Sequence, residues 1–443
     1  MDKYILTFTN NPLFLDFNLT EFLSLCEMNK IENLKYNSDT FSYDVNTNPF
    51  LRINFTGIEN KEICKKIIDR AILLKNIIKI ISEGETIEEL LNNIKEEEYR
   101  EEINSSLTFR YDIDTRNLKM KKEEQEKIML KFDKYILKGK VNIKNPERIF
   151  VIFLLYSKDG KLQRAIYGKE IYGKNEKEMR YYTKFDLIHR KYIGPTSTDH
   201  TLSFLMTNFA QIKKYDNIID PFVGTGSLLI PSSFFQANCF GCDLDIRVLK
   251  GYSIGYVRDN NNSNNVKFEG NIFSNFEDYN LIKPQIIRFD INHHSFKKNN
   301  FFFDSIICDP PYGWRASSKK TGLSEKRKEK RDLRLIKQLD NKNINNEDFN
   351  NFVCDENGEK RLFLPTSHCE INTIYDSLIN FAKDCLKKNG LLVFLFPVQK
   401  TKDNLIDRPI YFPQDKTFKL KYCCENKNSK IRSRWCLVYQ KIE

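Results

Sequence analysis

The chain has 443 residues, of which 40% are hydrophobic and 13% aromatic, enough apolar material for two or three domains with buried cores. Its 71 Lys and Arg residues outnumber its 60 Asp and Glu residues, and the net charge of +11 is compatible with a polyanionic partner. No apolar run approaches the roughly 20 residues of a membrane-spanning helix, and the N-terminus has no signal-peptide pattern, so we expect neither a membrane protein nor a secreted one.

Eleven cysteines are scattered along the chain without the regular spacing of a disulfide framework. We therefore expect reduced thiols in an intracellular protein, with a cytoplasmic location. Cys239 and Cys242 form a Cys-x-x-Cys pair, but no second pair or histidine cluster stands nearby at zinc-ligand spacing. We expect no metal site there.

Expected strands and helices alternate in the first half of the chain, as in an α+β domain. Apolar runs predict strands over Tyr4–Phe8, Phe41–Val45, Phe50–Phe55, Leu107–Tyr111 and Ile149–Tyr156. Helical spacing predicts helices around Phe22–Cys26, Ile63–Ile72, Glu88 and Glu123–Phe132, the first of them capped by Asn18 or Thr20. None of these segments carries a pattern that indicates catalysis.

Positive charge gathers towards the end of this half. A basic turn, Gly139–Glu147, leads into the strand at Ile149–Tyr156. Further cations follow at Lys161, Arg164, Lys169, Lys174, Lys177 and Arg180. A solvated surface would account for this charge without any further role. Contact with nucleic-acid phosphates is the alternative, and the sequence leaves both open.

The second half contains a strand that runs into a Gly-rich turn. After a loop and a helix over His200–Ala210, the strand Asn217–Asp220 is followed by Pro221–Ser227, where glycines permit a close backbone approach to a ligand. Asp243 ends the next expected strand, some 23 residues after Asp220. Nucleotide-like cofactors need such a pair of acids, one beside the turn and one for ribose hydroxyls. The turn is not Gly-x-Gly-x-x-Gly and no phosphate-binding lysine follows it, so we expect a nucleoside without phosphates.

Two more expected strands end in acids. Ile286–Asp290 is one, and the apolar run Phe301–Cys308, followed by Asp309, is the other. A helix with Ile374, Leu378, Phe381 and Leu386 on one face and a Gly390 stop, a strand at Leu391–Phe396, and a hairpin of Phe418–Cys424 with Ile431–Tyr439 complete the pattern. This βα alternation predicts a doubly wound sheet with right-handed crossovers. One acid at the end of a strand could be a local cap or a coincidence, but acids at the ends of four successive strands are not expected by chance.

The stretch Asp309-Pro310-Pro311-Tyr312 stands at the end of the fourth of these strands. The prolines stop the strand because neither can donate to a ladder. Asp309 and Tyr312 then lie at the carboxyl end of the sheet, where open α/β sheets bind ligands. An acid that accepts hydrogen bonds beside a ring that can stack is suited to a planar base with an exocyclic amine. A Pro-rich turn after a core strand is the plainer alternative.

Three stretches do not follow the alternating pattern. Asp259–Asn265 and Asn341–Asn351 are Asn-rich and are typical of biased loops. Between Lys319 and Lys337, nine basic residues stand against three acids. This basic block follows the Asp-Pro-Pro-Tyr turn, and a lid helix, a nucleic-acid contact and disordered padding all remain open for it.

These motifs carry a family resemblance. Asp220–Ser227 resembles the first cofactor motif of class I S-adenosylmethionine-dependent methyltransferases, and Asp309–Tyr312 resembles the catalytic motif of members that methylate exocyclic amines. A narrower resemblance, to eukaryotic tRNA (guanine-10-N2)-methyltransferase catalytic subunits, extends over roughly Tyr4 to Lys441. It is carried by Arg190–Gly194 with Thr196, Ser197 and Asp199, by Asp309–Gly313 with Trp314 and Arg315, and by Gly139–Pro146, which resembles part of a THUMP-type RNA-binding region.

The resemblance implies a domain plan and a reaction. Residues 1–180 would form an α+β region with a THUMP-like tRNA-binding domain, and residues 181–443 a Rossmann-like methyltransferase domain. The implied reaction transfers a methyl group from S-adenosyl-L-methionine to the N2 amine of a guanosine in tRNA, at position 10. An adenine-N6 or other nucleic-acid amino-methyltransferase is the rival enzyme, and an inactive RNA-binding subunit is the rival from another class.

The resemblance also implies residue roles. Asp220, Gly224, Thr225, Gly226 and Ser227 would surround the methionine part of the cofactor, Asp243 would bind the ribose hydroxyls, and Asp290 the adenine amine. Asp309 and the Pro310 carbonyl would accept the two hydrogens of the target amine, and Tyr312 would stack on the base. Pro195, His200 and Pro231 depart from the family pattern without removing a residue that the chemistry needs.

A protein partner is implied as well. Enzymes of this kind form a heterodimer with a small zinc-containing activator subunit that covers apolar surface on the catalytic domain. The second half is rich in aromatics beside its strands, at Phe234, Phe235, Phe240 and Phe301–Phe303. We expect most of these rings in the core, and an exposed remainder would mark the interaction site. Pairing with the strand of Cys239 and Phe240, or cover over the Phe234 helix, is the expected form of contact.

Overall fold

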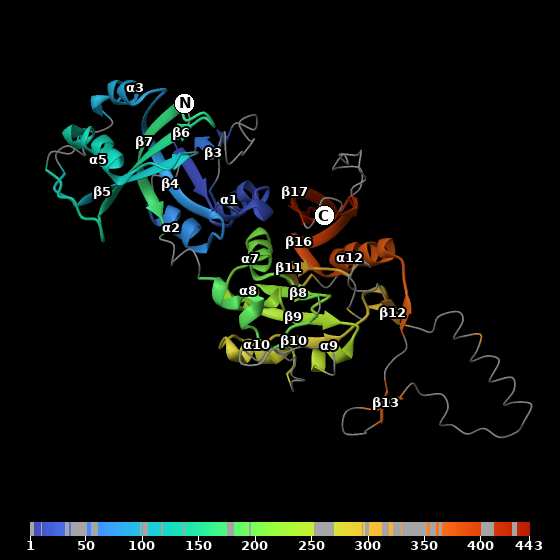
Figure 1. Cartoon of the computed structure of the whole chain (residues 1–443). Helices are drawn as coiled ribbons and strands as arrows, with labels where there is room; N and C mark the ends of the chain where they lie inside the picture. Colours follow the sequence, from blue (N-terminus) through green and yellow to red (C-terminus); the bar gives the residue numbers. More distant parts are fainter. Residues whose placement is uncertain are drawn as a thin grey trace, which may run out of the picture. The chain divides into compact units, whose positions relative to one another are not determined.

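The structure is a computed structural model of the whole chain, shown in Figure 1. It describes residues 4–9, 11–31, 35–36, 51–54, 61–97, 100, 105–116, 118–135, 138–174, 181–194, 196–251, 270–294, 296, 301–311, 319–321, 329, 352–354, 360–362, 366–399, 412–427 and 432–443. The chain divides into two compact units, Met1–Tyr181 and Tyr182–Glu443. Each unit has its own seven-stranded sheet, and each is described by itself.

The first unit is an α+β structure, as expected. Its sheet has the order β2-β3-β1-β4-β7-β6-β5, with β5 and β6 parallel and the other neighbours antiparallel. The strands are β1 (Tyr4–Phe8), β2 (Lys35–Tyr36), β3 (Leu51–Asn54), β4 (Leu74–Gly84), β5 (Phe109–Arg116), β6 (Arg148–Tyr156) and β7 (Leu162–Gly173). The helical segments are η1 (Pro12–Phe14), α1 (Phe17–Met28), α2 (Lys61–Arg70), α3 (Ile87–Asn92), α5 (Lys122–Leu130) and η3 (Asp133–Tyr135).

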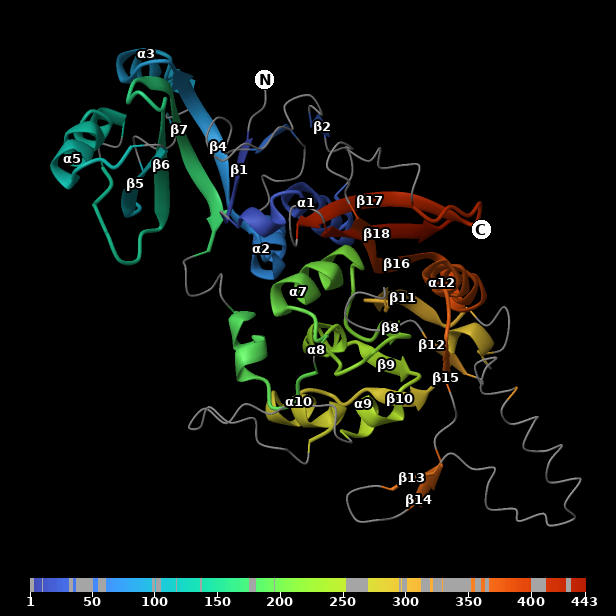
Figure 2. The same cartoon turned by 45° about the vertical axis from the view of Figure 1, so that its right-hand side comes forward.

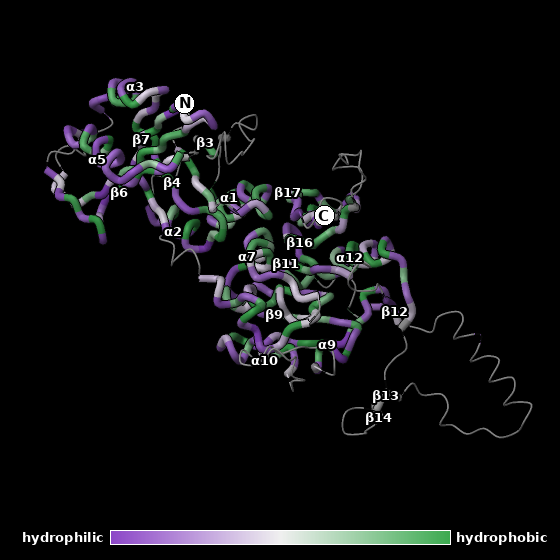
Figure 3. The backbone as a smooth tube through the Cα atoms, in the orientation of Figure 1, coloured by the Kyte–Doolittle hydropathy of each residue, from purple (hydrophilic) through white to green (hydrophobic). Residues whose placement is uncertain are grey.

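Helices α3 and α5 pack on this sheet through apolar side chains. Leu90 of α3 and Ile128 of α5 are buried in one cluster with Phe150 and Tyr167 of the sheet. Hydrophobic and hydrophilic residues alternate along these helices in Figure 3, as expected for helices with one buried face. Buried Glu21 of α1 is a polar exception, because its carboxylate accepts the backbone N–H groups of Ile72 and Leu73 at 2.6 and 2.8 Å.

Several expectations for the first unit are corrected. Strands β4 and β7 were not expected. Arg164, one of the expected surface cations, is exposed on β7 and pairs with Glu83 of β4 at 2.8 Å. Helix α1 begins at Phe17 after Asp16, which makes no side-chain capping bond, so capping by Asn18 or Thr20 is wrong. Phe41–Val45, Lys177 and Arg180 lie outside the described residues.

The second unit has the expected doubly wound sheet, shown from two sides in Figures 1 and 2. Its order is β10-β9-β8-β11-β16-β18-β17, in which the first five strands are parallel and β18 and β17 form an antiparallel hairpin against β16. The strands are β8 (Asn217–Asp220), β9 (Asn238–Asp243), β10 (Gln285–Arg288), β11 (Phe303–Cys308), β16 (Leu386–Gln399), β17 (Phe418–Lys427) and β18 (Arg432–Lys441). The closing hairpin is therefore confirmed.

The helical segments of the second unit include the expected helix after His200. They are η4 (Thr183–Phe185), η5 (Leu187–His189), α7 (His200–Phe209), α8 (Leu229–Phe234), α9 (Ile246–Lys250), α10 (Ile272–Asp278), η6 (Ile291–His293) and α12 (Ile371–Cys385). Leu378 and Phe381 of α12 are buried against Ile306 of β11 and Phe394 of β16. This packing fixes the strand that carries Asp309.

The expected end of the last helix is wrong. Helix α12 ends at Cys385, and Leu386 already belongs to β16, so Gly390 does not stop the helix. The left-handed residue of this segment is Asn389, with φ of 65°. Pro231 is the third residue of α8, where its missing N–H falls among the donors that a helix start leaves without an internal partner.

The aromatic residues of the second unit pack largely on one another. Phe234 contacts Phe185 and Phe204 at ring-centroid distances of 5.4 and 5.9 Å, and Phe240 contacts Phe302 and Phe303 at 5.6 and 5.5 Å. Strand β9 hydrogen-bonds to β8 on one side and β10 on the other, so pairing of a partner with the Cys239 strand is wrong. The outer strand on this side of the sheet is β10.

Two short strand pairs follow the Asp-Pro-Pro-Tyr turn. They are β12 (Lys319–Thr321) with β15 (Thr366–His368), and β13 (Phe352–Cys354) with β14 (Lys360–Leu362). The rest of the basic block apart from residue 329, both Asn-rich loops, and Tyr312 lie outside the described residues. None of the helices in the described part of the chain is long and apolar enough to cross a bilayer.

Candidate active site

The acids that end the parallel strands meet at one edge of the sheet. Asp220 is the last residue of β8 and Asp243 the last of β9, while Asp309 directly follows β11. Strand β8 lies between β9 and β11, where the strand order reverses direction along the chain. Ligands of open α/β sheets bind at this switch point, outside the carboxyl ends of the strands. The structure thus brings together three of the four acids that the sequence singled out.

Asp220 is buried at the centre of this site. Its Oδ1 accepts the N–H of Phe222 at 2.9 Å. Burial raises its pKa well above the ordinary value for aspartate, and the negative charges of Asp243 and Asp309 add to that rise. Three neighbouring carboxylates in a poorly solvated place leave the site short of positive charge, so a cationic ligand would relieve it.

The Gly-rich turn after β8 depends on two glycines with left-handed backbones. Gly224 has φ of 51° and Gly226 has φ of 86°. A Cβ atom at Gly226 would come within 3.1 Å of Phe276 and 3.2 Å of Ile272. Both the dihedral angle and the space therefore favour glycine at Gly226. The turn brings the N–H of Gly224 to Asp243 Oδ2 at 3.0 Å.

Asp243 is held in place by backbone donors. Its Oδ1 accepts the N–H of Asp245 at 2.8 Å and its Oδ2 that of Gly224 at 3.0 Å. Burial raises the pKa of Asp243 to about 6, against these hydrogen bonds, which lower it. Each carboxylate oxygen can accept more than one hydrogen bond. The carboxylate is therefore oriented and keeps acceptor capacity for two hydroxyl groups.

The side chains of Thr225 and Ser227 are engaged by the loop that opens the second half. Thr225 Oγ1 lies 2.7 Å from the hydroxyl oxygen of Ser197, which accepts the N–H of Gly194 at 2.8 Å. Arg190 donates from Nη1 to Ser227 Oγ at 2.7 Å, and burial lowers the pKa of Arg190 to about 10. These hydroxyls fix the turn to the loop, and a cofactor contact by these two residues stays a prediction.

Asp290 lies two residues beyond the end of β10 and is fully engaged by its own chain. Its Oδ2 accepts the N–H and the hydroxyl of Thr321 at 2.7 and 2.6 Å, and its Oδ1 accepts the N–H and the side-chain amide of Asn292, both at 2.9 Å. Burial alone would raise its pKa, but these hydrogen bonds outweigh burial and lower the pKa to about 2. An adenine amine would have to compete with Thr321 for this carboxylate, and that role stays a prediction.

Asp309 and the buried Pro310 stand at the end of β11, as the sequence indicated. Thr198 Oγ1 donates to Asp309 Oδ2 at 3.1 Å, and Arg434 Nη1 lies 3.4 Å from the same oxygen. The structure gives no position for Tyr312, which lies outside the described residues. The roles of these three residues at a target amine stay predictions.

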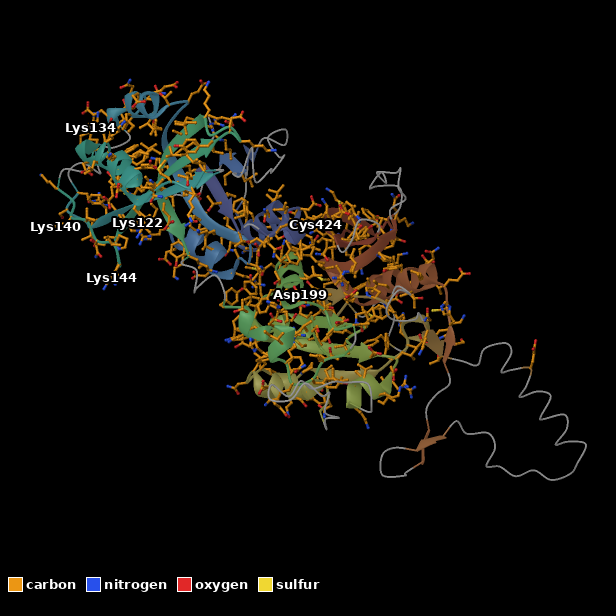
Figure 4. The ribbon with its side chains drawn as sticks, viewed as in Figure 1. Lys122, Lys134, Lys140, Lys144, Asp199 and Cys424 are labelled. Atoms are coloured by element: carbon orange, nitrogen blue, oxygen red, sulfur yellow. The ribbon has the colours of Figure 1, made fainter. Side chains whose placement is uncertain are left out.

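Sequence reasoning missed Thr198 and Arg434, and it assigned no site role to Arg190, which it noted only as part of a motif. Thr198 stands one residue before Asp199, whose carboxylate caps α7 by accepting the N–H of Leu202 at 3.1 Å; Asp199 is labelled in Figure 4. The direction of the hairpin could have indicated Arg434. A strand that runs antiparallel to β16 must begin at the carboxyl end of the parallel strands, which is where Arg434 stands.

The structure offers no metal centre in the part of the chain that it describes. No group of three or more His, Cys, Asp or Glu side chains there has a metal-binding arrangement. Burial raises the pKa values of Cys239 and Cys242 to about 12, so both thiols are protonated at neutral pH. Both side chains are buried in the core.

Family models match both units of the chain. The model described as Tmrp11 THUMP N-terminal domain matches residues 2–174, and the model described as RMKL-like, methyltransferase domain matches residues 188–272.

Curated proteins match over nearly the whole chain. The tRNA (guanine(10)-N(2))-methyltransferase TRMT11 of Rattus norvegicus is 27% identical, over 100% of this chain and 88% of its own length. The tRNA (guanine(10)-N(2))-methyltransferase of Saccharomyces cerevisiae is 27% identical, over 99% of this chain and 93% of its own. Among solved structures, TrmN from Thermus thermophilus covers 99% of both chains with 15% identity and a TM-score of 0.39.

The sheet order, the acids at the strand ends and the matched methyltransferase model make this chain a class I methyltransferase that carries an N-terminal THUMP domain. The expected fold class, a Rossmann-like domain preceded by an α+β THUMP-type region, is confirmed. Over nearly its whole length the chain is similar to eukaryotic tRNA (guanine(10)-N(2))-methyltransferases.

Proposed function

We propose that this chain transfers a methyl group from S-adenosyl-L-methionine to the exocyclic N2 amine of guanosine 10 in tRNA. The observation that carries the proposal is the position of Asp309 and Pro310 beside Asp220 and Asp243, at the switch point of the sheet. The curated relatives bear this activity in their names. The THUMP model that matches the first unit supports RNA as the substrate class.

The residues at the switch point fit S-adenosyl-L-methionine. Its sulfonium and ammonium groups are cationic, and Asp220 stands among carboxylates whose charges raise its pKa. Asp243 keeps acceptor capacity for the ribose hydroxyls, and Gly224 and Gly226 permit close backbone approach to the methionine part. Bound there, the cofactor supplies an electrophilic methyl group.

The target amine needs help because its lone pair is delocalised into the guanine ring. Asp309 and the Pro310 carbonyl can accept its two hydrogens, which orients the nitrogen lone pair towards the methyl group. A preorganised acceptor also stabilises the positive charge that develops on the amine. Tyr312 would stack on the base. Because the amine is inaccessible in a paired helix, the nucleotide must flip out to reach Asp309.

The first unit has an exposed basic region that would contact tRNA phosphates. Lys122, Lys134, Lys140 and Lys144 are exposed and lie towards one end of this unit in Figure 4. The loop that carries Lys140 and Lys144 is ordered by Asn142, whose Oδ1 accepts the N–H of Lys144 at 3.2 Å. Fixed cations on a rigid loop bind a shaped polyanion with less loss of entropy than mobile ones.

A small zinc-containing activator subunit is the protein partner that we propose for the second unit. The outer strand β10 presents Ile287, which is 49% exposed, and Ile282 in the preceding loop is 64% exposed. Among the described residues no strand pairs with the outer edge of β10, and apolar side chains beside such an edge are typical of a surface that another chain covers. A cytoplasmic location agrees with free thiols such as Cys26, Cys64 and Cys242.

Transfer of labelled methyl groups tests the proposed substrate. The full-length chain is incubated with labelled S-adenosyl-L-methionine and unmodified tRNA, duplex DNA or a tRNA in which guanosine 10 is replaced together with its pairing partner. We expect label in the first tRNA alone. An adenine-N6 or DNA methyltransferase would label DNA or the substituted tRNA, and an inactive RNA-binding subunit would bind tRNA without transferring label.

A further inference from the structure

Arg434 reaches the candidate active site from the far end of the chain. It is the third residue of β18, and its register partners are Pro397 of β16 and Asn426 of β17. Because β18 runs against the parallel strands, its first residues lie where those strands end. The hairpin, which has no part in the cofactor motifs, thereby delivers a cation to the acid that follows β11.

The guanidinium of Arg434 bridges two acceptors. Its Nη1 donates to Asp309 Oδ2 at 3.4 Å, and its Nη2 donates to Asn426 Oδ1 at 3.3 Å. The side chains of Arg434 and Asp309 are only 15% and 13% exposed, so the pair is poorly screened by water. Arg434 is thus anchored on its own hairpin while it contacts the acid.

Thr198 makes the second contact to the same oxygen. Its hydroxyl donates to Asp309 Oδ2 at 3.1 Å from the loop that precedes α7. Two donors from two separate elements define the direction of the carboxylate better than either donor alone, since each removes a different rotation. A planar guanidinium adds directional preference that a lysine ammonium lacks.

Among the residues that the structure describes, the other charged and titratable groups near Asp309 do not supply this positive charge. Asp220, at the end of β8, interacts with Asp309 as a like charge. Burial raises the pKa values of the Cys308 thiol on β11 and the Cys436 thiol on β18, and both stay neutral at physiological pH. Arg434 therefore offsets a concentration of negative charge that would otherwise favour protonation of the acid.

We propose that Arg434 is a positioning residue for methyl transfer, which acts together with Thr198 to keep Asp309 ionised and to aim its carboxylate at the target amine. The inference rests on the proposed function and goes beyond it, since it assigns a role to a hairpin residue outside the cofactor and catalytic motifs. In this arrangement Asp309 is an oriented hydrogen-bond acceptor whose charge is shared with a guanidinium.

Single-turnover methylation of tRNA by the full-length chain, at saturating cofactor and tRNA between about pH 5.5 and 9, tests this role. We expect Arg434→Gln to lower the rate constant on the order of a hundredfold, as a misaligned reacting group does. The acid limb of its pH–rate profile should also move to higher pH. Arg434→Lys should keep the position of that limb, because the positive charge is retained. It should lose part of the rate, because a lysine ammonium lacks the planar, directional donors of a guanidinium.

Three further variants separate positioning from general damage. Thr198→Val removes the second donor without a change of charge, and should lower the rate while moving the acid limb to higher pH by less than Arg434→Gln does. Lys427→Gln removes an exposed cation at the same end of the hairpin as Arg434, where Lys427 is the register partner of Ser433, and should change neither quantity. Added to Asp309→Asn, Arg434→Gln should cause no further loss, because a residue that acts through Asp309 has nothing left to position.

Several outcomes would overturn the inference. One is an Arg434→Gln enzyme with an unchanged rate and profile, and another is a loss confined to tRNA affinity, which would make Arg434 a phosphate contact. An equal loss in Lys427→Gln would indicate a general charge effect. If Arg434→Gln does not fold, an Arg434→Lys enzyme with wild-type rate would decide against the role. A wild-type chain that binds tRNA and cofactor but transfers no methyl group would instead refute the proposed function, and this inference with it.

Discussion

The pH dependence of cofactor binding should report on Asp243. Burial raises the pKa of this carboxyl from 3.8 to about 6 in the free chain. Only the ionised carboxylate can accept hydrogen bonds from both ribose hydroxyls, so the protonated fraction is a binding-incompetent population. With a pKa of about 6, the ionised fraction falls about tenfold between pH 7 and pH 5, and the apparent dissociation constant should rise by the same factor.

The same carboxyl should affect the stability of the ligand-free chain in the opposite sense. Because its folded-state pKa is raised, its stabilising contribution is complete below about pH 3.8 and is lost as the pH rises through about 6. The difference between these values corresponds to about 3 kcal/mol of unfavourable free energy at pH 7. Asp243→Asn cannot ionise, and should therefore stabilise the free chain by up to that amount while weakening cofactor binding.

Calorimetric titration with S-adenosylhomocysteine at pH 7 and pH 5, with thermal unfolding of the same samples, measures both effects. We expect the wild type to lose about tenfold in affinity between these pH values. Asp243→Asn should bind weakly at both and show little pH dependence. The matched variant Asp220→Asn should retain the pH dependence that belongs to Asp243. A variant Asp243→Asn that keeps the wild-type affinity, or the tenfold pH effect, would refute the assignment of Asp243 to the ribose.

Three other predictions follow from the site and the two units. Asp309→Ala should lower methyl transfer about a hundredfold to a thousandfold in single-turnover assays, because it removes a preorganised contact to the amine. The affinity of this variant for S-adenosylhomocysteine should stay close to that of the wild type. Near-normal turnover would contradict the role of Asp309. Binding of tRNA by the full chain should weaken steeply between low and moderate salt, and Lys140→Gln with Lys144→Gln should flatten that slope, whereas a salt-insensitive interaction would count against phosphate contacts. Co-expression with a zinc-containing activator subunit should raise yield and activity, and Ile287→Asp should reduce that gain; a chain that is fully active alone and gains nothing from the subunit would dismiss the partner.

The parallel strands of the second unit could be predicted because their signals are local. Ile218 and Ile219 before Asp220, and Ile306 and Ile307 before Asp309, are short apolar runs that end in an acid. Runs of this kind are typical of strands buried on both faces. The chain direction of such strands places the acids at one edge, so the candidate site followed from sequence and topology together.

Strands β4 and β7 could not be predicted in the same way. Their pairing shifts register between Ile77 and Ile78 and again between Ile80 and Ser82, so the alternation of apolar and polar residues is interrupted. Charged side chains such as Arg164 also occupy β7, where they pair across the sheet. Such bulges interrupt the alternation of apolar and polar residues by which a strand is recognised in a sequence.

Contacts between side chains that are far apart in the sequence are the second kind of feature that the sequence did not reveal. Arg434 and Asp309 are 125 residues apart, and their pairing depends on which end of β18 meets the carboxyl ends of the parallel strands. The hydrogen bonds from Thr321 to Asp290 likewise join two segments that lie before and after strand β11 in the sequence. Residue type and spacing cannot fix such contacts, because the register of the tertiary structure determines them.

The measurement that tests the central claim most directly is nucleoside mass spectrometry of tRNA after reaction with the full-length chain and labelled S-adenosyl-L-methionine. The account predicts one labelled product, N2-methylguanosine, which maps to position 10 and is absent when Asp309→Ala replaces the wild type. Label in a methylated adenosine, in a guanosine at another position, or in tRNA that lacks guanosine 10 would contradict it.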